Sequence, residues 1–70
     1  MTRDLTAVGE ALYGRIWQAQ LSELLQVDSR RVRAWLSNER PIPDGVWKEL
    51  AGELRRRGKR AMSLADQLAE

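Results

Sequence analysis

The sequence predicts an all-helical protein, a compact bundle of about five short helices. No segment alternates apolar and polar residues as a strand would, and the valines are isolated. Leucine, alanine, arginine, glutamate and glutamine dominate, and all five favour helices. Seventy residues correspond to one domain, residues 1–70. A chain this short buries only a small core, so we expect a partner subunit to add stability.

The first half of the chain predicts two helices. The first begins near Thr2 to Asp4 and ends at Gly14, and the second runs from about Trp17 to Leu25 and ends near Gln26. Apolar residues recur in them at helical spacing: Leu5, Val8, Ala11, Leu12, Leu21, Leu24 and Leu25.

Three more helices are predicted after Gln26. Asp28 or Ser29 caps a third helix, which ends by Asn38 because the prolines at 41 and 43 cannot continue it. Asp44 caps a fourth helix, which reaches about Arg57 and ends or bends at Gly58. A fifth runs from about Arg60 to Ala69. Their apolar residues are Val32, Trp35 and Leu36 in the third, Val46, Trp47, Leu50 and Leu54 in the fourth, and Met62, Leu64, Ala65 and Leu68 in the fifth.

The composition argues against several functional classes. The chain has no cysteine and no histidine, which excludes disulfides and removes the commonest metal ligands and the commonest general base. We therefore expect no enzyme, no cofactor and no metal site. No stretch has the apolar length of a signal peptide or a membrane span. The expected location is the cytoplasm of a bacterium or a phage-infected host, associated with the nucleoid.

The charges are unevenly distributed. The net charge is +2, yet the segment from Ser29 to Arg60 carries ten lysines and arginines against four acidic residues. A basic centre in an otherwise balanced chain is typical of a protein that binds a polyanion.

The stretch from Gln18 to Trp35 carries the clearest functional pattern. Leu21, Leu25, Val27, Val32 and Trp35 have the spacing of two short helices that cross steeply through a tight turn, with Val27 at the corner. Ser22 is small where the helices would approach each other. The stretch resembles the helix-turn-helix of phage repressors and small bacterial regulators, as does the loop from Asn38 to Pro41. Gln26 stands where that family usually has glycine, and Ser22 stands where it usually has alanine.

Side-chain chemistry on the third helix suggests how DNA would be read. A helical wheel places its polar residues opposite Val32 and Trp35, with no acidic residue among them. We expect base readout from Ser29, Arg30, Arg33, Ala34 and Ser37, because such a face enters the major groove without obstruction and its arginines can donate to guanine. Backbone contacts are expected from Arg15, Gln18, Arg31, Asn38 and Arg40, and that of Gln18 is implied by the resemblance.

Three other features of the sequence allow a different interpretation. The stretch from Val32 to Arg40 also looks like a homeodomain recognition helix, but the prolines stop it too early and the basic arm is missing. The basic run from Arg55 to Arg60 is typical of a solvated helix end, with DNA contact as the less favoured alternative. Trp17, Trp35 and Trp47 are expected in the core rather than as stacking platforms.

The last segment predicts how the protein assembles. Residues 59–70 would form a dimerisation helix with Met62, Leu64, Ala65 and Leu68 at the interface of a homodimer, or would fold back on the fourth helix. A dimer would read an inverted repeat. The resemblance, which extends to phage-borne regulators encoded beside anti-CRISPR genes, implies an autorepressor. The alternative is a helical protein-interaction module without specific DNA binding.

Overall fold

The computed structural model describes residues 3–69, so Thr2, a possible start of the first helix, and Glu70 lie outside the described range. It confirms an all-helical protein, with four helices in the described residues: α1 (Leu5–Tyr13), α2 (Gln18–Leu25), α3 (Ser29–Leu36) and α4 (Asp44–Leu68). No helix among them combines the length and apolar character that a membrane crossing requires.

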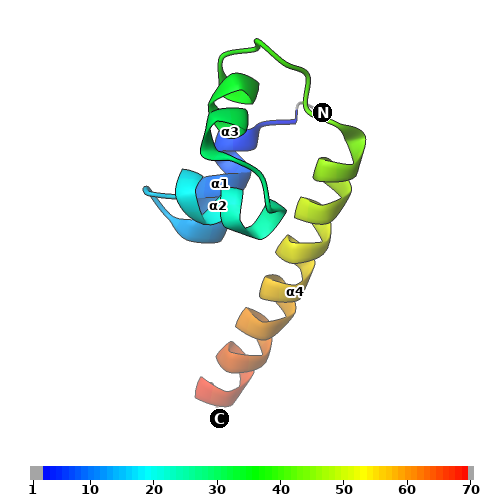
Figure 1. Ribbon diagram of the computed structural model, residues 1–70. Helices are drawn as coiled ribbons and strands as arrows, with labels where there is room; N and C mark the ends of the chain where they lie inside the picture. The colour runs from blue at the N-terminus through cyan, green and yellow to red at the C-terminus, as the bar shows by residue number, and fades with distance from the viewer. Residues whose placement is uncertain (1–2, 70) are drawn as a thin grey trace.

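The prediction of five helices in a compact bundle was wrong. The segments expected as a fourth and a fifth helix form one 25-residue helix, α4, and the last segment neither forms a separate helix nor folds back. Gly58 lies inside α4, where one glycine costs only about 1 kcal/mol and good helix formers flank it. The C-terminal half of α4 therefore extends beyond the other helices (Figure 1), and the molecule measures 49 × 24 × 19 Å.

Both ends of α1 follow the sequence closely. The Asp4 carboxylate accepts a hydrogen bond from the Ala7 backbone N–H at 3.2 Å, which satisfies a free donor at the start of α1. Gly14, at φ 79°, ends that helix in a backbone conformation that glycine adopts most easily. The start of α4 differs from expectation. Pro43 is the cap residue and makes no side-chain hydrogen bond, and Asp44 is the first helical residue.

The core draws on all four helices. Its buried apolar side chains are Leu5, Leu12, Trp17, Leu21, Val32, Trp35 and Leu50. Trp17 and Trp35 are core residues as expected, and Trp47 is half-buried beside them. Helix α1 packs against both α2 and α4, and α2 packs against α3. This arrangement leaves the far side of α3 on the surface.

Gly9 makes room for the largest core side chain. It is buried in α1, and a Cβ added there would overlap the Trp17 ring. Trp17 lies in the loop before α2, so the missing side chain lets that loop, and α2 with it, approach α1.

We expect Gly9→Ala to destabilise the protein by about 1–3 kcal/mol, because the added methyl group must displace a buried ring. The free energy of unfolding in urea, at fixed protein concentration, measures this effect. Gly45→Ala is the matched control, because a Cβ at Gly45 meets open space. It should be neutral or stabilising, since alanine favours helices more than glycine. Equal stability of both variants and the parent protein would contradict the close packing of Trp17 against Gly9.

Candidate nucleic-acid interface

A short turn sets the position of α3. Gln26 has left-handed backbone angles (φ 55°, ψ 46°). The N–H groups of Gln26 and Val27 donate to Glu23 and Ser22 carbonyls at 3.2 and 3.0 Å. Val27 is half-buried against the core, and buried Ser22 donates its hydroxyl to the Ala19 carbonyl. The chain therefore makes this turn with Gln26 at the position where the family that the sequence resembles usually has glycine.

Of the two possible caps for α3, the structure uses Asp28. Its carboxylate accepts a hydrogen bond from the Arg30 backbone N–H at 2.9 Å, and Ser29 becomes the first helical residue. Val32 and Trp35 point into the core from the same helix. Because both inner positions are fixed by burial, the opposite face of α3 is held toward solvent.

That outer face carries the residues predicted to read bases. Ser29, Arg30, Arg33 and Ser37 are exposed, and Ala34 is half-buried between them. The Ser37 hydroxyl donates to the Ala34 carbonyl at 3.2 Å. Within residues 3–69, the ion pairs involve only Arg3, Arg56 and Arg57 among the arginines, so the arginines of α3 remain unpaired there.

A shallow hollow of about 340 Å³ beside α3 brings together residues to which the sequence analysis gave different roles. Arg30, Arg31 and Arg40 line it together with Ala34. The hollow therefore joins Arg30, assigned to bases, with two arginines assigned to the backbone, whereas Arg33 lies outside it. Asp28 and Glu39 also line the hollow, so carboxylates border the basic surface although none lies on the outer face of α3 itself.

The end of α3 is fixed by backbone hydrogen bonds. Asn38 has left-handed angles (φ 64°), and its N–H donates to the Trp35 carbonyl. The N–H of Glu39 donates to the Ala34 carbonyl at 2.9 Å. Asn38 and Arg40 are both exposed, and Ile42 returns to the core between the two prolines. Two of the residues predicted for backbone contact, Asn38 and Arg40, thus follow the C-terminal end of α3, whereas Arg31 lies in its first turn.

The start of α2 offers a second possible contact. Trp17, its cap residue, is buried and makes no side-chain cap hydrogen bond. The first N–H groups of α2 therefore have no side-chain cap, and such groups bind anions readily. Gln18 is exposed there, as is Arg15 in the preceding loop. Ile16, between them, is 83% exposed and was not singled out from the sequence.

The basic run from Arg55 to Arg60 lies inside α4 and is not a helix end. Arg56 and Arg57 form ion pairs with Glu53 at 3.0 and 3.3 Å, and the Arg56 hydrogen bond contributes most to holding the Glu53 pKa below its usual value. Arg57 also stacks over the Tyr13 ring and donates to the Leu12 carbonyl. Arg57 therefore attaches α4 to α1, a role that the sequence did not reveal because it depends on residues 45 positions apart.

The comparisons add no relative: no protein family, no curated protein and no solved structure matches the chain. Any functional assignment therefore depends on the residues and their geometry.

The turn before α3 predicts an unusual response to glycine. A non-glycine residue in the left-handed region is strained by about 1–2 kcal/mol. Gln26→Gly would relieve this strain. Part of the resulting gain in stability is offset, because glycine increases the conformational entropy of the unfolded chain. We expect Gln26→Gly to stabilise the protein by up to about 1 kcal/mol in urea unfolding. Gln20→Gly, at an exposed position inside α2, should instead cost about 1 kcal/mol. Similar losses from both substitutions would contradict the left-handed turn.

Proposed function

We propose that the protein is a sequence-specific regulator of transcription that binds double-stranded DNA through a helix-turn-helix formed by α2, the turn at Gln26 to Asp28, and α3. The observation that carries the proposal is the outer face of α3. Its arginines are exposed and form no ion pair within residues 3–69, and they lie beside small residues on a helix whose inner face is buried. A helix of this kind can enter the major groove, which is about 12 Å wide.

Within this proposal, the residues of α3 divide by their position. Arg30 and Arg33 donate to guanine O6 and N7, and Ser29, Ala34 and Ser37 touch neighbouring base edges or thymine methyl groups. Arg31 and Arg40 bind phosphates on either side of the hollow they share with Arg30. Asn38 lies beside them at the end of α3.

The start of α2 supplies the remaining backbone contacts in this proposal. Gln18 and the uncapped N–H groups of the first turn face a phosphate, and Arg15 assists from the loop. Contacts from α2 and from both ends of α3 would fix the depth and angle at which α3 lies in the groove. Phosphate contacts of this kind position the protein and do not discriminate sequence.

The regulator is further proposed to act as a homodimer that reads an inverted repeat and represses its own transcription. Support comes from the last segment of α4, where Met62, Leu64 and Leu68 are 65%, 46% and 87% exposed, and Ala65 is also exposed. Large apolar side chains exposed along one helix are typical of an interface. Two subunits reading one operator would also explain how eight-residue helices achieve useful specificity.

Salt dependence tests DNA binding directly. Once selection from a random duplex pool has defined a site, its affinity should fall steeply between about 50 and 200 mM salt, with a log–log slope near −0.9 per phosphate contacted. Binding is measured by fluorescence anisotropy. An affinity that salt does not change, or no binding to any duplex, would favour a helical protein-interaction module instead.

Replacing Arg33 with alanine tests base readout. We expect Arg33→Ala to cost about 1–3 kcal/mol on the selected site and little on random DNA, because a base contact discriminates sequence whereas a phosphate contact does not. Lys59→Ala removes one charge from an exposed position of α4 and serves as the matched control. Equal losses on both DNAs would assign Arg33 to the DNA backbone.

The role of the α4 end is tested by a charge substitution. Leu68→Asp should shift sedimentation at micromolar concentration toward the monomer and weaken operator binding at least about tenfold, because both half-sites are no longer bound together. The side chain is already exposed, so the fold of the subunit should persist. Ser63→Asp, also exposed, is the control. An unchanged dimer in Leu68→Asp would remove this segment from the interface.

A further inference from the structure

The unbroken course of α4 creates a regular pattern that two separate helices would not have. Small and apolar residues recur at alternating intervals of four and three along its whole length. We name this row the α4 seam: Trp47, Ala51, Leu54, Gly58, Ala61, Ala65 and Leu68. Alternating spacing of this kind keeps one face of a helix against a partner helix, as in a coiled coil.

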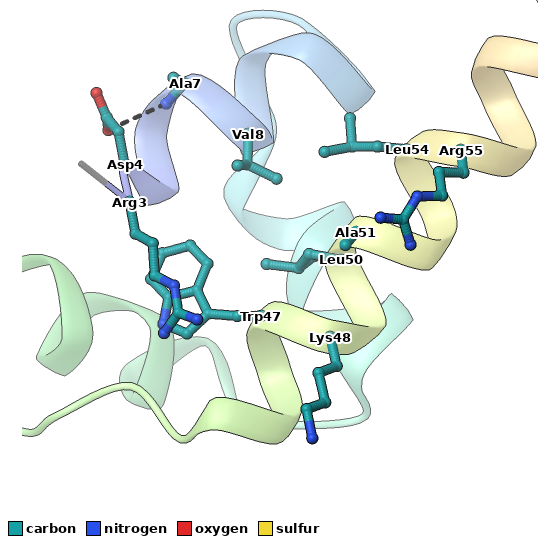
Figure 2. Close-up of a pocket in the computed structure, with 10 residues that line it drawn as sticks. All are labelled: Arg3, Asp4, Ala7, Val8, Trp47, Lys48, Leu50, Ala51, Leu54 and Arg55. Atoms are coloured by element: carbon teal, nitrogen blue, oxygen red, sulfur yellow. Dashed lines mark hydrogen bonds between the residues drawn. The ribbon is translucent and has the colours of Figure 1, made fainter. Parts of the chain in front are cut away.

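Burial divides the seam into two halves. Trp47, Ala51 and Leu54 are half-buried, and the four residues from Gly58 onward are exposed. The first half borders a groove of about 540 Å³ between α1 and α4. Figure 2 shows Val8 of α1 and Leu50 and Leu54 of α4 directed into the space between the two helices. The exposed half of the seam extends beyond this groove, and none of residues 3–69 of the same subunit buries it.

Gly58 gives an independent indication of a close neighbour. It lies in the middle of α4, where glycine is less favourable than alanine by about 0.5–1 kcal/mol. A Cβ at this position would meet nothing within 4 Å in the subunit. Nothing within the subunit therefore requires the absence of a side chain. A second helix crossing at this point would require it, because small residues let two helix backbones approach closely.

We propose that two copies of the chain pair through the α4 seam in antiparallel orientation, so that the exposed end of each α4 lies along the groove of the other subunit. This inference rests on the dimer of the proposed function and specifies its geometry. In antiparallel pairing, Leu68 faces Ala51 of the partner, Ala65 faces the partner's Leu54, and Ala61 faces the partner's Gly58. Both leucines of the paired stretch thus meet an alanine.

Charge favours the same orientation. Lys48 and Arg55 line the groove together with Arg3, whose guanidinium stacks on Trp47 at 5.5 Å. Asp66 lies near the end of the exposed half of α4. In the antiparallel register, Asp66 lies about 3 Å along the axis from the partner's Arg55. It is level with the partner's Glu53, whose charge Arg56 and Arg57 already pair. Parallel pairing would instead place every residue of the run from Arg55 to Arg60 level with its own copy. In the antiparallel register, only Lys59 and Arg60 of that run lie level with each other.

The arrangement also sets a distance between the two DNA-binding units. Leu50 anchors α4 in the core of each subunit. With a rise of about 1.5 Å per residue, the two Leu50 side chains are separated by about 28 Å along the paired helices. Successive major-groove half-sites on one face of DNA are about 34 Å apart. The pairing therefore separates the points at which the two α4 helices enter their cores by a distance of the same order as the half-site spacing.

Two single-cysteine variants test the pairing, because the parent chain has no cysteine. Ala51→Cys and Leu68→Cys are prepared separately, one with a size tag, then mixed without DNA in a glutathione redox buffer. Antiparallel pairing predicts that the mixed disulfide exceeds each disulfide between identical variants by at least about tenfold, since proximity raises the effective concentration of the two thiols. Ser63→Cys, exposed and on another face of α4, replaces Leu68→Cys in the control and should give no enrichment.

Each alternative outcome overturns the pairing in a recognisable way. Enriched disulfides between identical variants would indicate a parallel dimer. If sedimentation shows a dimer but the mixed disulfide is not enriched, the interface lies elsewhere. If sedimentation shows a monomer, the proposed dimer itself is refuted. Circular dichroism of both variants establishes that they are folded. Because DNA takes no part in the cross-linking, a failure of DNA binding would be detected separately in the salt titration.

Discussion

The packing of α2 against α3 is the constraint on which the rest of the arrangement depends. Leu21 of α2 and Val32 of α3 are both 0% exposed, and the turn between the helices places them in one core. Once Val32 and Trp35 are buried, the helical period fixes which residues of α3 face solvent. The positions of Arg30 and Arg33 on the surface are therefore a consequence of apolar burial and need no interaction of their own.

Most of the local structure could be predicted from the sequence, and the errors have physical causes. Aspartate and glycine marked the two ends of α1, and the prolines at 41 and 43 marked the end of α3, because these residues act on the adjacent backbone. Gly58 was misjudged by the same reasoning. Gly14 ends α1 with a positive φ, whereas Gly58 keeps helical backbone angles between favourable neighbours, so α4 is continuous.

Features that depend on distant residues could not be predicted. The need for glycine at position 9 becomes visible only when the Trp17 ring is placed against it. The basic run in α4 looked uniform in the sequence, yet Arg57 binds α1 and Glu53, whereas Arg55 lines a groove. Likewise, the hollow beside α3 groups Arg30 with Arg31 and Arg40, because the chain after Ala34 turns back through backbone hydrogen bonds.

Under the proposed pairing of two subunits, the exposed end of α4 would make folding and concentration interdependent. Residues 58–69 are all exposed in the subunit, and a helical segment of about twelve residues is marginally stable in water without tertiary contacts. Dilution would then unwind this segment as well as separate the subunits, and the unwound end is the kind of chain that proteases cleave. If the protein controls its own synthesis, as proposed, the lifetime of the polypeptide would thereby rise with its abundance. Recovery after a fall in its level would then begin slowly and accelerate.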